Sequence, residues 1–274
     1  MLTMACLGAL VAAHAKEPRA TPAGSADRDA LWRKIHDACA AAAARGTYPP
    51  APCAEVDANG THAVLKDRVG RYQYLVLPLA RVTGIESPAL LAPGAPDYFA
   101  AAWTARLYLE AALHRRLPRD EVILAVNSAY GRSQDQLHIH VDCIRPDVHD
   151  ALHRLLPTLA GPWRRLEEPL PPHGHAYWAR WVAGGTLPVD PFKSLAAALP
   201  AGDRMAQHSL AVVGARAADG RPGFILLSGR ADPSGGDRGS SDELQDHTCA
   251  IAASSPRHRS AARRPRQGPA TGTP

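Results

Sequence analysis

The sequence predicts an α+β protein in which a largely antiparallel sheet carries flanking helices and is extended by a second α+β half. Three observations predict this class. Short segments rich in Val, Ile and Leu surround one helical stretch in the order strand, strand, helix, strand, strand. An apparent β-hairpin follows in the second half of the chain. The sequence contains no glycine-rich phosphate loop of the Gly-x-Gly-x-x-Gly or Walker type, the motif that would indicate a parallel nucleotide-binding sheet.

The first half contains the strand-strand-helix-strand-strand unit. Its central helix is expected over residues 96–116, because apolar residues recur there at helical spacing. Gly60 and Gly70 stand at turn positions next to the strands. The expected elements are, in chain order, a helix within residues 27–43, strands at 62–66 and 71–82, the helix 96–116, and strands at 121–128 and 136–144.

The second half is expected to begin with a helix over residues 147–156, which directly follows the last of these strands. Another helix is expected at 190–199, and a hairpin joins the strands 208–216 and 223–229. Residues 231–241 have the composition of a loop.

Composition and termini indicate one exported globular protein. With 274 residues, of which 46% are hydrophobic, the chain can bury a sizeable core. A short apolar run ends in Ala13-His14-Ala15, which fits an export cleavage site and is shorter than the roughly 20 residues that span a bilayer. We therefore expect a leader or short membrane anchor at 1–15, a linker at 16–26, one folded domain at 27–252 and a disordered basic tail at 253–274.

The formal charge of +5 does not indicate a nucleic-acid-binding protein. Many of the arginines lie in the tail "RHRSAARRPRQ", which is too poor in apolar residues to order itself. We therefore expect no nucleic-acid partner.

The cysteines support export. Outside the leader there is an even set of four with no Cys-x-x-Cys spacing, so disulfides in an oxidising compartment are favoured over zinc, and four buried thiols are the alternative. Cys39 and Cys53 are separated only by a short Pro-rich stretch and should pair easily, which leaves Cys143 for Cys249.

The segment "QLHIHVDCI" is the strongest candidate for chemistry. Strand side chains alternate between faces, so Gln136, His138, His140 and Asp142 should share one face while aliphatic residues fill the other. One exposed histidine would carry little weight, but two at i and i+2 indicate a site.

Three chemistries could use such a face. The imidazoles could ligate zinc with a third ligand from elsewhere, such as His62 or His175, although no acidic partner stands at a diagnostic spacing. An imidazole could instead attack phosphorus and form a phosphoramidate that water then cleaves. The face could also simply bind anions. The pair His149 and His153 lacks the glutamate of a zinc-protease helix and is better explained as a solvated helix face.

The string "QLHIHV" is similar to the His-x-His-x-His signature of the histidine-triad superfamily, and "GRSQDQLHIH" and "KD…QYLVLP" resemble its flanking segments. The resemblance implies a histidine-triad-like (HIT-like) fold. It also implies that His138 is the nucleophile that attacks a nucleotide α-phosphate and that His140 is an orienting triad member. Asn127 and Ser133 would contact phosphate, and Asp67 the ribose.

Two positions depart from that pattern. Gln136 stands at the first triad position, and Gln73 matches a buried strand histidine of the family. A glutamine can donate a hydrogen bond to phosphate but cannot change charge near neutral pH, so both are expected to bind substrate while leaving-group protonation is altered.

A wider set of strings, "PCAEV", "YLVLP…GIESP", "HIHVDCIRPDV", "GHAYWARWV" and "LQDHTC", resembles the bacterial CDP-diacylglycerol pyrophosphatases, a histidine-triad branch of the cell envelope. The resemblance covers about residues 31–251. It implies hydrolysis of CDP-diacylglycerol to CMP and phosphatidate at the periplasmic side of the inner membrane, in contact with the membrane surface, with no cofactor and no metal. Candidate cations for the pyrophosphate are Lys66, Arg132, Arg145 and Arg180.

Two other functions stay open. One is a metal-dependent envelope phosphohydrolase. The other is a non-catalytic nucleotide or lipid-headgroup binder, which the glutamine at the first triad position makes worth testing.

Overall fold

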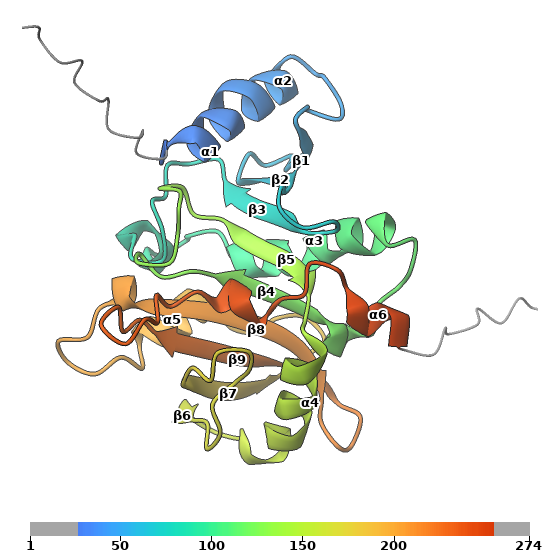
Figure 1. Cartoon of the computed structure of the whole chain (residues 1–274). Coiled ribbons are helices and arrows are strands. Elements are labelled where there is room, and N and C mark those ends of the chain that lie inside the picture. The colour runs from blue at the N-terminus through green and yellow to red at the C-terminus, as the bar shows by residue number, and fades with distance from the viewer. Residues whose placement is uncertain (1–26, 255–274) are drawn as a thin grey trace, which may run out of the picture.

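A single antiparallel sheet of nine strands organises residues 27–254, the part of the chain that the computed structural model describes (Figure 1). The strand order is β1-β2-β3-β5-β4-β8-β9-β7-β6. The strands are β1 (Cys53–Val56), β2 (His62–Lys66), β3 (Tyr74–Pro78), β4 (Val122–Val126), β5 (Ile139–Cys143), β6 (Arg164–Arg165), β7 (Tyr177–Ala183), β8 (His208–Arg216) and β9 (Pro222–Arg230).

Short helices surround this sheet. The N-terminal helix is continuous but changes winding, from α1 (Ala30–Arg33) through the π-helical η1 (Lys34–Ala40) to α2 (Ala41–Ala44). The longer helices are α3 (Tyr98–Ala112) and α4 (Pro146–Leu155), followed by α5 (Pro191–Ala196) and α6 (Ala250–Ser254). The 3-10 turns are η2 (Pro88–Leu91), η3 (Arg119–Glu121), η4 (Leu156–Thr158), η5 (Met205–Gln207) and η6 (Ser241–Leu244).

The α+β class and the strand-strand-helix-strand-strand unit are confirmed by β2, β3, α3, β4 and β5. The predicted hairpin is β8 and β9, which pair along their whole length. The two halves share one sheet, because β4 pairs with β8 from Ile123↔Val213 to Val126↔Leu210. The second half therefore extends the same sheet that carries the histidine strand.

Two strands of the second half were missed. In β7 the side chains of Trp178, Arg180 and Trp181 are half buried, so the segment lacks the polar and apolar alternation that marks a strand. The strand β6 has only two residues, both exposed. This short strand forms because it pairs with β7, and the local sequence gives no sign of that pairing.

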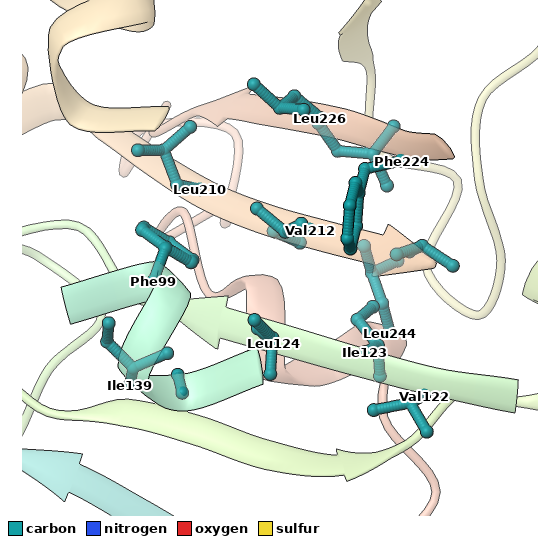
Figure 2. Close-up of a cluster of buried hydrophobic side chains, with 14 of the residues drawn as sticks. Phe99, Val122, Ile123, Leu124, Ile139, Leu210, Val212, Phe224, Leu226 and Leu244 are labelled. Atoms are coloured by element: carbon teal, nitrogen blue, oxygen red, sulfur yellow. The ribbon is translucent and has the colours of Figure 1, made fainter. Parts of the chain in front are cut away.

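The main core lies between α3 and one face of the sheet (Figure 2). Phe99 of α3 packs in the same buried cluster as Ile139 of β5, Leu124 of β4 and Phe224 of β9. Asp97 caps α3, since its carboxylate accepts a hydrogen bond from the Ala100 amide at 2.9 Å. Because strand side chains alternate, Gln73, Leu75, His138 and His140 face the side of the sheet away from α3.

The N-terminal helix covers part of that second face. Ile35 and Cys39 pack against Leu65, Leu75 and Leu77 in a separate buried cluster. The first part of the same helix, at Ala30, Leu31 and Lys34, lines a cavity together with His138 and His140. This face is where the site forms.

Both predicted disulfides are confirmed. Cys39–Cys53 ties the N-terminal helix to β1, and Cys143–Cys249 ties the end of β5 to the segment before α6. In Figure 1 this last segment crosses the sheet near β4 and β5 on its way to α6.

The predicted leader and linker (1–26), and all but the first two residues of the predicted tail, lie outside the described residues. Within residues 27–254, none of the helices has the length and apolar character needed to cross a membrane.

Candidate active site

A cavity of about 350 Å³ opens on the face of the sheet away from α3. Its walls come from the N-terminal helix, the β2–β3 turn, the loop after β4, β5 and the C-terminal segment around η6. The residues that line it are Ala30, Leu31, Lys34, Leu65, Lys66, Asp67, Arg68, Val69, Gln73, Leu75, Asn127, Gly131, Ser133, Gln134, His138, His140, Asp242 and His247.

His138 stands just before β5 with one ring nitrogen already engaged. Its Nδ1 lies 2.7 Å from the main-chain oxygen of Gln136, and a carbonyl can only accept, so Nδ1 carries the proton. Burial, assisted by the nearby ring of His140, lowers the pKa of His138 to about 4. The ring is therefore neutral at pH 7, and Nε2 keeps a free lone pair in the cavity wall.

His140 is the second buried imidazole of the cavity. Its ring lies edge to face with that of His138, with centroids 4.9 Å apart. Neither of its ring nitrogens has a hydrogen-bond partner among the described residues, although both are buried. A buried polar group without a partner is costly, so this ring is suited to a ligand that brings hydrogen-bonding oxygens.

Five other predicted site residues also line the cavity: Lys66, Asp67, Gln73, Asn127 and Ser133. Most of them also hold the walls together. The Lys66 ammonium donates to the main-chain oxygens of Asp67 and Gly70, and the Asn127 side chain accepts from the Asp242 amide. Gln73 is buried and donates to Gln245.

Gln136 and Arg132 do not line the cavity. The Gln136 amide is buried and donates to the main-chain oxygens of Pro78 and Ala80, at 2.9 and 3.0 Å. Arg132 is nearly buried in ion pairs with Glu86 and Asp135. Both side chains therefore support the loops around β5 from outside the cavity.

The remaining cations and histidines considered from the sequence lie elsewhere. Arg145 pairs with Asp147, and the Arg180 guanidinium donates to Ser194. The other four residues, His62, His149, His153 and His175, do not line this cavity.

The charged or titratable lining residues that sequence reasoning missed are Lys34, Arg68, Asp242 and His247. Lys34 comes from the N-terminal helix and Arg68 from the β2–β3 turn, so no local pattern connects either with β5. His247 lies in the string "LQDHTC", whose only signal in the sequence is its resemblance to the family.

His247 forms a close pair with Asp142. Its Nδ1 lies 2.7 Å from Asp142 Oδ2, and the Asp142 side chain is fully buried. The hydrogen bond to this carboxylate raises the pKa of His247. Burial raises the pKa of Asp142, while the bonds from His247 and from the Cys143 amide act in the opposite direction.

Residues 27–254 contain no preformed set of free metal ligands of the kind that the metal-dependent alternative would use. The one cluster of three candidate ligand atoms there joins Asp142 with Cys143 and Cys249, and both sulfurs are used in a disulfide.

Two comparisons with known proteins each match most of this chain. A family model described as CDP-diacylglycerol pyrophosphatase matches residues 26–253. A curated relative from Yersinia pestis, named CDP-diacylglycerol pyrophosphatase, is 40% identical over 225 residues, which cover 81% of this chain and 84% of the relative.

Proposed function

The chain belongs to the CDP-diacylglycerol pyrophosphatase family, and on that premise we propose that it hydrolyses CDP-diacylglycerol to CMP and phosphatidate with His138 as the nucleophile. Family membership supports the overall reaction. The covalent step rests on one observation, the fixed tautomer of His138.

The Gln136 carbonyl holds the proton of His138 on Nδ1, so Nε2 is the atom available for attack. Burial keeps the ring neutral. In the first step Nε2 bonds to the CMP phosphorus and the bridging P–O bond to phosphatidate breaks. In the second step water attacks that phosphorus, the N–P bond breaks, and CMP leaves.

The cavity also provides partners for the pyrophosphate. The protonated nitrogen of the His140 ring can donate a hydrogen bond to a phosphate oxygen, which would give that buried nitrogen a partner. Lys34, Lys66 and Arg68 offset the two negative charges of the substrate. We assign Asp67 to the ribose hydroxyls, as the resemblance implies, because it lines the same cavity.

The substrate is a lipid, so the cavity mouth should meet a membrane. Val69, which lines the cavity and is 56% exposed, stands in sequence between the exposed residues Arg68 and Arg71. An apolar tip between two cations is suited to an anionic bilayer surface. Val69→Asp should weaken sedimentation with phosphatidylglycerol vesicles, whereas Leu107→Asp, an exposed leucine outside this cavity, should not. Equal binding by the two variants would contradict this orientation.

We further propose that the protein acts at the periplasmic side of the inner membrane. Two disulfides in residues 27–254 agree with an oxidising compartment. Protease added to spheroplasts of cells that produce the protein should cleave the folded domain. Full protection, with a cytoplasmic marker protected alongside, would contradict export.

The central experiment is incubation of the purified protein with CDP-diacylglycerol in ¹⁸O-water, followed by identification of the products. The label should appear in CMP, because water attacks the cytidylyl-histidine, and not in phosphatidate. After a non-acidic quench, the intact mass should increase by that of a cytidylyl group. Peptide mapping should place this group on the peptide that contains His138. Label in phosphatidate, or activity lost to EDTA and restored by a stoichiometric metal, would favour the metal-dependent alternative.

A further inference from the structure

The paired side chains of His247 and Asp142 form a second chemical unit in the cavity wall, which the two-step scheme above does not use. His247 lines the same cavity as His138, but it comes from the segment between η6 and α6. Its Nδ1 is held by Asp142, and Nε2 has no partner among the described residues. A carboxylate that fixes one imidazole nitrogen leaves the other to exchange protons with a ligand.

The structure holds this ring in place from three directions. Asp142 lies on the same face of β5 as His140 and accepts from the His247 ring at 2.7 Å. The disulfide Cys143–Cys249 fixes the segment two residues away. Gly70, at φ +77°, leaves room for the ring, since a Cβ there would lie 3.1–3.2 Å from His247 atoms.

The charges around His247 favour its protonated form. Asp142 on β5, Asp242 on η6 and Asp67 in the β2–β3 turn all raise its pKa, and the Asp142 hydrogen bond contributes most. The cations Lys66 and Arg68 line the same cavity. His138, in contrast, is kept neutral, so the two imidazoles are suited to opposite roles.

We propose that His247, positioned by Asp142, is the general acid that protonates the departing phosphatidate, an inference that rests on the proposed function. Gln136 cannot supply this proton, because an amide does not change charge and its N–H groups are bound to Pro78 and Ala80.

The proton balance closes over the two steps. While His138 Nε2 bonds to the CMP phosphorus and the bridging P–O bond breaks, the Nε2 proton of His247 passes to the leaving phosphate oxygen. Water then attacks the cytidylyl-histidine and gives its proton to the neutral His247 as the N–P bond breaks. The imidazolium is restored, and no other reactant is needed.

The test is single-turnover release of phosphatidate from CDP-dioctanoylglycerol between pH 5 and 10. The wild-type rate should fall on the alkaline side, as His247 loses its proton. In His247→Gln the rate should be at least tenfold lower and this alkaline decline should be absent. The matched control is His36→Gln, which removes a surface histidine whose ring also bonds a carboxylate, that of Asp37. It should behave as wild type.

Asp142→Asn gives a readout that a purely structural role would not produce. Loss of the carboxylate charge lowers the pKa of His247, so the alkaline decline should move to lower pH. Fluoride release from cytidine 5′-phosphorofluoridate needs no proton, and His247→Gln should be much less impaired there than with the lipid.

The outcomes separate the two proposals. A folded His247→Gln with wild-type rate and profile, or a wild type with no alkaline decline, would overturn the acid role while leaving the hydrolysis intact. A wild type that does not cleave the CDP-lipid would overturn the proposed function, and the acid role with it.

Discussion

Gln73, next to β3, donates its side-chain amide to the side-chain oxygen of Gln245 at 3.0 Å, and both side chains are buried. Gln245 in turn donates to the main-chain oxygens of Ile123 and His140, at 3.3 and 3.2 Å. This chain of hydrogen bonds joins the C-terminal segment to three strands beneath the cavity. The position of His247 therefore depends on contacts between residues far apart in sequence.

Gln245→Ala should loosen that segment. It removes the side-chain bonds that Gln245 makes with buried groups of Gln73, Ile123 and His140, which should lower the free energy of unfolding by about 1–3 kcal/mol. Hydrolysis should decline as well, because the segment carries His247. Urea unfolding and CDP-lipid turnover measure the two effects. Gln207→Ala, which removes a surface bond to Arg230, is the control and should change neither.

Much of the fold could be predicted, because its information is local. The strands β2 and β4 show apolar runs, β5 alternates polar and apolar residues, and α3 shows helical spacing with an aspartate cap. The site was half predicted for the same reason. His138 and His140 lie two residues apart in sequence, whereas His247 is brought beside them by tertiary contacts: the hydrogen bond to Asp142, the disulfide and the Gln245 bonds.

Gln136 shows the opposite limit. Its place at the first triad position suggested a phosphate contact, but the chain bends before β5 and the Gln136 amide donates to Pro78 and Ala80. The partner of the Gln136 amide is set by the path of the loop that contains Pro78 and Ala80, and the sequence around Gln136 does not show that path.

The two disulfides should differ in what they protect. Cys249→Ser frees the segment that carries His247, so it should lower turnover strongly and reduce the free energy of unfolding by about 2–5 kcal/mol. Cys53→Ser releases the outer end of the N-terminal helix and should cost comparable stability with less effect on the rate. Equal rate losses, compared below the unfolding transition of both variants, would show that the second disulfide has no special role in the site.

His138 should make the protein less stable in acid. Its folded-state pKa of about 4 lies below the ordinary histidine value, so the unfolded chain binds a proton that the folded one resists. The stability contributed by the neutral ring is complete above about pH 6.5 and falls by about 3 kcal/mol as the pH drops towards 4. Urea unfolding of wild type and His138→Asn at pH 7.5 and 4.5 isolates this difference. If both lose the same free energy, the ring is not held neutral by burial.

The nucleophile assignment predicts chemical rescue. His138→Gly should remove turnover and open a space beside the CMP phosphorus where free imidazole can attack, so added imidazole should restore part of the activity and form imidazole-CMP. The matched control is His140→Gly, which should lower the rate without rescue. His140 orients and does not attack, so a free imidazole nucleophile does not replace what this variant has lost. His138 is buried beside the cavity, so near-ultraviolet circular dichroism must first show that each variant is folded. Full activity of His138→Gly without imidazole, or equal rescue of the two variants, would end the assignment.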